Sequence, residues 1–562
     1  MFVRAKKSGT YEYLQIVENQ RIDGKVRQRV VATLGRLDIL QATGKVDALL
    51  SSCARFAQNV SVLDAHKRGT LPAAKTIKIG PPKVFGRLWK QTGLPEVIGA
   101  LLKGRKYEFD VERAIFLTVL HRLMVSGSDR GAEQWCRGYA IEGIDTIELH
   151  QIYRAMAWLG EPLSSDKQFG ATPFSPRCTK DLIEESLFAR RRDLFGSLDL
   201  IFFDTTSIYF EGEGGQTIGQ FGNSKDSRPD LKQMVVGAVL DGQGHPICCE
   251  LWPGNTADVK TLVPIVDRLK SKFGIDRICI VADRGMISKE TIAELKKSVR
   301  DVRYILGARM RAVKEIRQTV LADARPYESV YGPREKSKDP SPLEVKEVTV
   351  GTRRYVVCRN EEQARKDRAD RAAIVESLRE QLKRGDKSLV GNKGYRKYLA
   401  TPKSPEHFQI DEEKIRQEAI YDGIWVLQTD LDMPAHEVAL HYKELWMVEA
   451  IFRTIKSILA NRPVFHKCDE TIRGHVFCSF LALMLMKELQ SRMAGRGWIA
   501  EWERLKDDLD GLEEITVPAA GQHFVIRSET RGDAGKAIAA AGVALGPVIR
   551  PAPEKQKWLK LT

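Results

Sequence analysis

Two of the chain's acidic residues, Asp204 and Asp283, stand where their side chains could share a divalent metal ion. Asp204 ends the apolar run 198–204 (LDLIFFD), and Asp283 ends the run 277–283 (RICIVAD). Such runs predict buried strands, and α/β sheets carry their ligand sites at the carboxyl ends of strands. Two carboxylates that lie close together repel each other unless a cation lies between them, and oxygen ligands favour Mg²⁺ or Mn²⁺.

A third acid, Glu449, is singled out by its place on a long predicted helix that begins at Pro434 and ends near Leu459. At 100° per residue, five side chains fall on one stripe about 80° wide. This helix stripe consists of Tyr442, Trp446, Glu449, Arg453 and Lys456. An acid beside cations is ordinarily a surface ion pair, so the stripe alone favours that simpler interpretation. Together with the two aspartates, however, Glu449 would complete a two-metal site for phosphoryl transfer.

The segments around the two aspartates predict a mixed α/β core. Three meandering strands come first, and a helix, a strand, a second helix and a strand follow. The predicted strands are 198–204, 232–240, 245–251, 277–283 and 303–306, and the helices are 258–273 and 288–299, with Asp258 and Ser288 as N-caps. This order resembles the ribonuclease H-like nucleotidyl-transfer core.

The pattern breaks after this core, and residues 308–422 are interpreted as a β-rich insertion. It contains a predicted hairpin over 344–358, a highly charged helix over 361–383 and a glycine-containing loop over 384–396. Strand character returns at 424–428. A second apolar helix, 471–493, is expected to pack behind the Glu449 helix.

The chain ahead of the core predicts a basic hairpin and then a mostly helical region. Residues 11–17 and 26–34 are β-prone, and Asp23-Gly24 suits a tight turn between them. The first 36 residues carry eight Lys/Arg against three Asp/Glu, which fits either a phosphate-binding surface or an ordinary solvated one. Residues 84–195 read as helices, a suitable place for recognition of a DNA end, although no helix-turn-helix spacing is clear.

Charge and cysteine content narrow the function class. Among 562 residues, 89 Lys/Arg exceed 74 Asp/Glu and give a net charge of +15, which favours a polyanionic partner such as nucleic acid. No C-x-x-C pair occurs among the nine cysteines, so a zinc ribbon and a redox dithiol are not expected, and Cys248-Cys249 should pack in a core. The longest apolar stretch, 476–486, is too short for a membrane span, and no secretory signal is visible, so we expect a soluble, cytoplasmic protein.

Several blocks, taken in order, resemble a DDE transposase of the IS4-like group, and most specifically of the IS1634 insertion-sequence family. The resemblance covers nearly the whole chain, including the opening MFVRAKKSGTYEYLQIVE. The blocks are DTTSIYFEG from Asp204, SKDSRPDLKQ from Ser224, PGNTAD from Pro253, VADRG from Val281 and YKELWMVEAIFRTIK from Tyr442.

The resemblance implies roles for individual residues. It makes Asp204, Asp283 and Glu449 the catalytic, metal-binding acids, and an interruption of 165 residues between the last two suits the insertion typical of this group. The signature around the third acid is Tyr, two residues, Arg, three residues, Glu, six residues, Lys. Tyr442 and Lys456 match it and are expected to contact terminal phosphates, whereas Leu445 stands where the pattern has Arg. Arg453, on the same stripe, could supply that cation instead.

Other residues near the expected site could have either a functional or a purely structural role. Lys225 and Arg228 lie in a polar loop of the core and are expected to touch DNA. For Asp230 and Asp258 a cap or turn role is favoured. Trp425 and Trp446 could stack on an extruded base, but aromatic residues at such spacings more often belong to a core.

The function implied is transposition. Water activated by Mg²⁺ or Mn²⁺, with two ions per site, would cleave the terminal inverted repeats, and the released 3′-hydroxyl would attack target DNA. The resemblance also implies a synaptic homodimer and a prokaryotic, nucleoid-associated protein. Two alternatives stay open: a ribonuclease H-like nuclease without joining activity, and a non-catalytic DNA-binding descendant of a transposase. The expected division of the chain is 1–80 (hairpin and linker), 81–196 (helical DNA-binding region), 197–307 (core, first part), 308–422 (insertion), 423–495 (core, second part) and 496–562 (C-terminal region).

Overall fold

The structure is a computed structural model, and the chain forms two compact units. The first comprises 1–76, 514–527 and 547–562, and the second comprises 77–513 and 528–546. The residues that the structure describes are 2–22, 25–46, 48–49, 75–125, 127–169, 171, 175–191, 199–286, 288–298, 302–384, 397–400, 408–458, 463–519 and 522–552.

The first unit contains a three-stranded antiparallel sheet made of β1 (Phe2–Ser8), β2 (Tyr11–Ile22) and β3 (Lys25–Arg36), followed by α1 (Leu37–Ala42). The predicted hairpin is confirmed as β2 and β3, and β1 is an additional strand; the turn expected at Asp23-Gly24 lies outside the described residues. A second sheet has the order β16 (Ile549–Pro551), β15 (Gln522–Arg527), β14 (Glu513–Ala519) and β4 (Lys75–Lys78). Strands β14, β15 and β16 are antiparallel.

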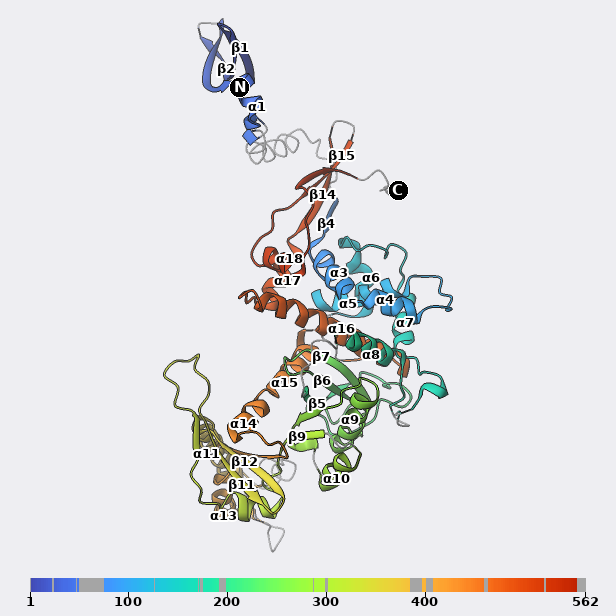
Figure 1. Cartoon of the computed structure of the whole chain (residues 1–562), viewed down its shortest axis with the longest axis vertical. Helices are drawn as coiled ribbons and strands as arrows, with labels where there is room; N and C mark the ends of the chain where they lie inside the picture. The colour runs from blue at the N-terminus through green and yellow to red at the C-terminus, as the bar shows by residue number, and fades with distance from the viewer. Residues whose placement is uncertain are drawn as a thin grey trace. The chain divides into compact units, whose positions relative to one another are not determined.

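The second unit begins with the predicted helical region (Figure 1). Its helices are α3 (Gly80–Thr92), α4 (Leu94–Leu101), α5 (Val111–Met124), α6 (Asp129–Trp135), α7 (Leu149–Leu159) and α8 (Thr179–Arg191). Helix α5 is buried almost all round because it contacts both α7 and the later helix α16 (Asp469–Ala494). Helix α16 matches the second apolar helix expected from the sequence, and α17 (Trp502–Asp510) and α18 (Ala534–Ala541) follow it.

The centre of the second unit is a mixed nine-stranded sheet, so the expected mixed α/β class is confirmed. Its order is β10-β11-β12-β13-β9-β8-β5-β6-β7. The meander consists of β5 (Asp199–Tyr209), β6 (Gln233–Leu240) and β7 (Pro246–Pro253), and β8 (Ile278–Ala282) and β9 (Val302–Gly307) then run parallel to β5. Cys248 and Cys249 are buried in β7, as expected.

The sheet has a separate hydrophobic core on each face. Phe202 of β5 and Val281 of β8 belong to the core shared by α14 (Ala435–Lys443), α15 (Trp446–Arg453) and α16. Phe203 belongs to the core formed with α9 (Leu262–Ser271) and α10 (Lys289–Ser298). Side chains alternate between the faces of a strand, so Asp204 follows Phe202 onto the α14–α16 side. Asp283 follows Val281 onto the same side.

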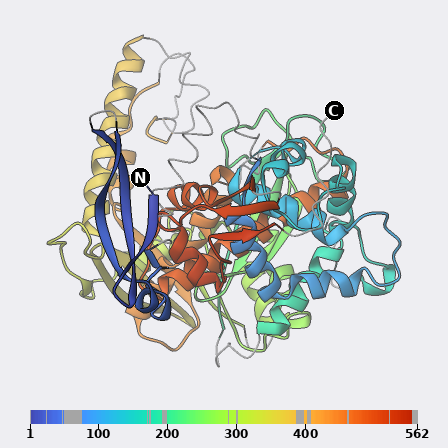
Figure 2. The same cartoon turned by 90° about the horizontal axis from the view of Figure 1, so that it is seen from above.

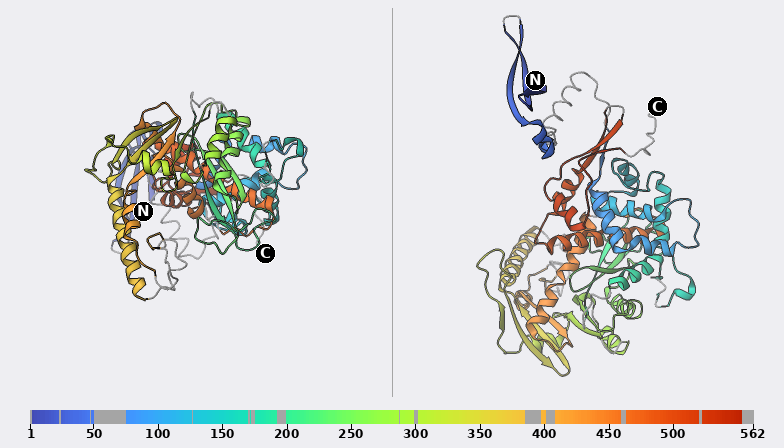
Figure 3. Two further views of the ribbon diagram at one scale, coloured as in Figure 1. Left: turned by 90° about the horizontal axis from the view of Figure 1, so that it is seen from below. Right: turned by 45° about the horizontal axis from the view of Figure 1, so that its top comes forward.

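The predicted insertion continues this sheet. It supplies β10 (Glu328–Tyr331), β11 (Leu343–Val350) and β12 (Arg353–Arg359), and β12 pairs with β13 (Ile424–Thr429), which pairs with β9. The charged helix is confirmed as α11 (Glu361–Arg384), the long helix in Figure 2, and α13 (Glu412–Ala419) follows. The orange helix α14 lies beside the yellow strands β11 and β12 (Figure 3). Residues 385–396 of the expected loop lie outside the described residues.

The helix expected from Pro434 to Leu459 is divided. It consists of α14 (Ala435–Lys443), α15 (Trp446–Arg453) and a π-helical turn, Thr454–Ile458. Between α14 and α15 the backbone hydrogen bonds tighten, because Leu445 N–H donates to the carbonyl of Tyr442 and Val448 N–H to that of Leu445.

None of the helices that the structure describes is long and apolar enough to cross a membrane.

Candidate active site

Asp204 and Asp283 lie side by side on neighbouring strands. Strands β5 and β8 are parallel, with Phe203 opposite Ala282, and each aspartate is the next residue along its strand. Asp283 directly follows β8, as predicted, whereas the expectation that Asp204 ends its strand is wrong. Strand β5 continues to Tyr209 because β6 pairs with it along that whole length. The two acids therefore lie together at the carboxyl end of β8, and not at the end of β5.

Burial dominates the electrostatics of Asp204. The pKa of this carboxyl is raised to about 6, chiefly by burial and also by the nearby charges of Asp283 and Asp258. The Lys225 ammonium and a hydrogen bond from Thr205 N–H to Asp204 Oδ1 (2.7 Å) act in the opposite direction. A carboxyl that is buried among other acids is stabilised in its charged form by a bound cation, so this pair can hold a metal ion.

Tyr442 connects α14 to the acidic pair. Its hydroxyl donates a hydrogen bond to Asp283 Oδ1 at 3.0 Å, and burial together with the Asp283 charge raises the pKa of the tyrosine. Gly307, at the end of β9, makes room for this contact. A Cβ atom at position 307 would meet the Tyr442 hydroxyl closer than Cβ atoms are found in real structures.

The structure does not bring Glu449 together with both aspartates. Among the described residues, the only group of three or more His, Cys, Asp or Glu side chains whose ligand atoms all lie within 4.8 Å of one another is elsewhere in the chain. Glu449 is exposed on α15, which packs against β5 and β6 through Val448, Ile451 and Phe452. The helix therefore carries Glu449 to the face of the sheet on which Asp204 and Asp283 lie, but this residue is exposed to solvent.

The two end residues of the helix stripe bond to residues of the core, whereas the three residues between them are exposed to solvent. At one end Tyr442 bonds to Asp283, and at the other Lys456 Nζ lies 2.7 Å from Asp226 Oδ1 in the β5–β6 connection. Trp446, Glu449 and Arg453, between them, are exposed. The departure at Leu445 has a structural counterpart, because this side chain is buried and packs in the core, where an arginine would not fit as a surface cation.

The two loop cations have different surroundings. Lys225 Nζ donates to the Thr205 carbonyl (2.7 Å) and lies 3.2 Å from Asp258 Oδ2, so it stands beside the acidic pair. Arg228 forms an exposed ion pair with Asp230 at 2.9 Å, which agrees with a turn role for Asp230.

The expectation that Asp258 caps a helix is wrong. Thr261 is the N-cap of α9, and the carboxylate of Asp258 accepts a hydrogen bond from Thr205 Oγ1 at 2.7 Å. Asp258 is therefore a further acid beside Asp204, and it contributes to the raised pKa of that residue.

A cavity of about 310 Å³ adjoins this group, and sequence reasoning missed one of its cations. Lys225, Asp258 and Arg309 line it, and Arg309 donates to the backbone carbonyls of Arg284 and Gly285. Arg309 follows the end of β9, the third parallel strand. Ligand sites in α/β sheets lie at the carboxyl ends of strands, and this rule, which predicted the site at the end of β8, could also have indicated Arg309.

The two tryptophans expected either to stack on a base or to pack differ in exposure. Trp446 is 63% exposed on α15, whereas Trp425 on β13 is partly buried against the main core. Only Trp446 is placed to meet a ligand from solvent.

Comparison with known families identifies the chain's relatives. Residues 2–65 match the family described as "IS1634 family transposase, N-terminal domain", and residues 196–485 match "Transposase DDE domain". The chain belongs to the IS1634 family of DDE transposases. The DDE match begins just before β5 and ends within α16, so it spans Asp204, Asp283, the insertion and Glu449. The N-terminal match covers the three-stranded sheet of this transposase.

Other comparisons add little. A search of curated proteins gave no match. One solved structure, "Cryo-EM structure of piggyBac transposase synaptic complex with hairpin DNA", is 10% identical, with a TM-score of 0.35 over 76% of this chain and 77% of that chain. A similarity this weak carries no inference.

Proposed function

We propose that this transposase binds the terminal inverted repeats of its insertion sequence and catalyses DNA cleavage and strand transfer at Asp204, Asp283 and Glu449. The observation that carries the proposal is the juxtaposition of Asp204 and Asp283 on neighbouring parallel strands, beneath the helix pair that bears Glu449. The strand order β9-β8-β5-β6-β7 supports a ribonuclease H-like core, and residues 308–422 are its β-rich insertion.

The acidic pair suits Mg²⁺ or Mn²⁺, because two neighbouring carboxylates supply hard oxygen ligands and one of them has a raised pKa that a cation would lower. Asp204 and Asp283 would hold the ions, and Glu449 would join them when the α15 side chains turn toward bound DNA. Two bound ions supply activation of the attacking oxygen and stabilisation of the leaving oxygen.

The remaining residues bind and orient the DNA backbone. Tyr442 orients the Asp283 carboxylate through its hydroxyl, and it would contact a phosphate next to the cleaved bond. Arg453 is exposed one turn after Glu449 and would bind a terminal phosphate in place of the arginine that Leu445 replaces. Lys225 and Arg228 would contact the strand that enters beside β5. Lys456 would exchange Asp226 for a phosphate.

The proposal includes a synaptic homodimer on two DNA ends, with 81–196 as the helical DNA-binding region. The basic β1–β3 sheet would bind the phosphate backbone, because the described part of it exposes most of its lysines and arginines. A prokaryotic, cytoplasmic location follows from the same proposal.

A strand-transfer assay tests the function. The inverted repeats are read from the DNA that flanks the gene, and a pre-cleaved end is incubated with Mg²⁺, the full-length protein and a target plasmid. We expect joined products from the wild type and none from Glu449→Gln, which should still bind the ends. If the wild type cleaves an intact end but does not join the pre-cleaved one, the nuclease alternative would be favoured. End binding without either reaction would favour a non-catalytic descendant, and full activity of Glu449→Gln would refute the assignment of the third acid.

A further inference from the structure

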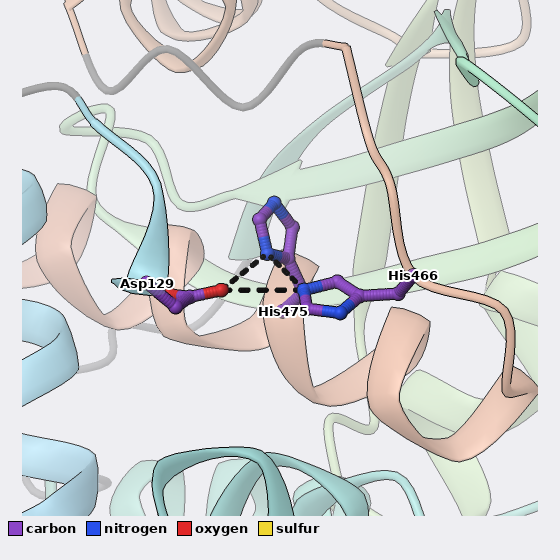
Figure 4. Close-up of side chains that lie close together, drawn as sticks. All are labelled: Asp129, His466 and His475. Carbon is purple, nitrogen blue, oxygen red and sulfur yellow. Dashed lines mark hydrogen bonds and ion pairs between the residues drawn. The ribbon is translucent and has the colours of Figure 1, made fainter. Parts of the chain in front are cut away.

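A second group of metal-ligand side chains lies outside the acidic site. Asp129 is the first residue of α6, His466 lies in the segment before α16, and His475 lies on α16. His466 Nε2 is 3.2 Å from Asp129 Oδ2 and 3.0 Å from His475 Nδ1, and His475 Nδ1 is 3.6 Å from Asp129 Oδ2. Figure 4 shows one ligand atom of each residue facing the other two.

These three separations match the spacing of ligands around a tetrahedral metal ion. With metal–ligand bonds of about 2.0–2.1 Å, the corners of a tetrahedron lie about 3.3 Å apart. A point beside the triangle of atoms can therefore lie at bonding distance from all three. A hydrogen-bonded pair of imidazoles needs one proton between the two nitrogens, whereas an ion accepts both lone pairs.

The protonation of the cluster also suits a metal. All three side chains are largely buried, with exposures of 6% for Asp129, 13% for His466 and 14% for His475. The guanidinium of Arg122 can only donate, and its NH2 lies 2.8 Å from His475 Nδ1, so this nitrogen carries a lone pair and the ring is neutral. A neutral imidazole and an ionised carboxylate are the forms that bind metal ions.

Arg122 is the group with which an ion would compete. Its NH2 lies 2.8 Å from His475 Nδ1 and 3.1 Å from Asp129 Oδ1, so it occupies one of the ligand lone pairs. Its NH1 is held independently by Ser479 Oγ at 2.6 Å and by the carbonyl of His475. Of the contacts that Arg122 makes with the cluster, an ion needs to displace only the one to His475 Nδ1, because Asp129 can keep Oδ1 on the guanidinium and offer Oδ2.

We propose that Asp129, His466 and His475 form a binding site for a transition-metal ion such as Zn²⁺, distinct from the acidic site. Two imidazole nitrogens and one carboxylate suit Zn²⁺, whereas Mg²⁺ prefers an all-oxygen set. The ion would join α6, in the helical region, to α16 and to the segment that leads into it. This inference rests on the cluster itself and does not depend on the proposed function.

Zinc uptake by the full-length protein tests the proposal. The Asp204→Asn/Asp283→Asn protein serves as the background, so that the acidic pair contributes no binding. After removal of metal with a chelator, the protein is dialysed against Zn²⁺ and the bound zinc is measured. We expect one ion per chain, and tetrahedral-type absorption when Co²⁺ replaces Zn²⁺. The His466→Ala and His475→Ala variants should lose both signals.

Cys468→Ser is the matched control, because this exposed thiol lies two residues from His466 but outside the cluster. The Cys468→Ser variant should keep the bound zinc. Loss of zinc from this variant would place the ion at the thiol and overturn the proposal. If His475→Ala does not fold, His466→Ala decides, since it alters a segment outside the helices. Zinc should also raise the Tm of the background protein. Absence of zinc uptake by the background protein, or unchanged uptake by His466→Ala, would refute the site.

Discussion

Burial makes the ionised form of Asp204 unfavourable in the metal-free protein, so the free energy of unfolding should depend on pH. Its pKa of about 6 lies above the ordinary value for an aspartate, so the folded state binds the proton more tightly than the unfolded state does. The charged form therefore opposes folding above pH 6, and this penalty disappears as the pH falls through 6 toward 4.

Asp204→Asn should accordingly stabilise the metal-free protein at pH 8 by about 1–3 kcal/mol and have little effect at pH 4. Urea unfolding at the two pH values measures the difference. Asp276→Asn, at an exposed acid, is the control and should leave the stability unchanged at both pH values. A destabilised Asp204→Asn at pH 8 would contradict the prediction.

The same pKa makes activity depend on pH when Mg²⁺ is subsaturating, because protons and metal ions then compete for this carboxyl. Cleavage by the wild type at subsaturating Mg²⁺ should fall as the pH drops below about 6. End binding, measured in parallel without metal, should not show this decline. A cleavage rate that stays level down to pH 5 would argue against Asp204 as a metal ligand.

Gly307 is required by the contact between Tyr442 and Asp283. In Gly307→Ala the added methyl group meets the tyrosine hydroxyl and must displace it, at a cost of about 1–3 kcal/mol in stability. We expect a marked loss of cleavage, and partial recovery of stability when Tyr442→Phe removes the hydroxyl in the same chain. Gly332→Ala, where the methyl group meets nothing within 4 Å, is the matched control and should have little effect on stability.

At the scale of the secondary-structure elements, the π-helical turn after α15 places Lys456 against Asp226. This ion pair joins the end of the helix to the β5–β6 connection, and it is largely buried, with side-chain exposures of 12% and 6%. Removing either partner takes a close counterion away from a largely buried charge. Lys456→Met and Asp226→Asn should each destabilise the protein by about 2–4 kcal/mol, with a double variant less affected than the sum.

A double-mutant cycle by chemical unfolding measures this coupling. The exposed pair Lys232–Glu213, at 3.0 Å, is the control, and its coupling should be below about 0.5 kcal/mol. Equal coupling in the two pairs would mean that the Lys456 contact is an ordinary surface interaction.

The sequence predicts most of these elements because their patterns are local. The β-branched and aromatic residues of 353–358 and the apolar residues of 471–493 are readable without tertiary information, and both elements are found. The break at Leu445 is not readable, because the tightened bonds of that turn leave the apolar spacing unchanged. Likewise, Asp204 looks like a strand end because the apolar run stops there. The strand continues only because β6, about 30 residues later, pairs with its polar half.

The acidic pair could be predicted from strand ends, but its surroundings could not. Asp258 looks like a helix cap from its position before an apolar segment, and only the fold brings its carboxylate to Thr205. Gly307 and Arg309 carry no motif of their own, since their roles depend on where β9 ends relative to β8. The exposed position of Glu449 is also a property of the folded helix pair.

On the scale of the whole molecule, the first 36 residues carry a large share of the positive charge, because their eight Lys/Arg and three Asp/Glu give +5 of the net +15. Arg27 and Arg29 of β3 are exposed and lie opposite Gln20 and Glu18, on one face of the first sheet. If this face binds phosphates, the Arg27→Glu/Arg29→Glu variant should bind DNA at least about tenfold more weakly and reduce the slope of log K against log salt by about two.

Titration of labelled DNA at several salt concentrations measures both quantities. Arg365→Glu/Arg416→Glu changes the net charge by the same amount at two exposed arginines that have acidic partners. This control should shift affinity much less. An equal loss in both variants would show that only the total charge matters.

The continuous nine-stranded sheet limits how this transposase can change in length. Strand β12 satisfies the backbone groups along all six residues of β13, and β11 and β10 extend the ladder outward. Excision of 308–422 would uncover β13 as an unpaired border strand, which invites self-association between molecules. Residues 308–422 therefore cannot be deleted without exposing the edge of the sheet. Shorter or longer descendants of this gene should differ in the stretches between these strands, while the strands themselves persist.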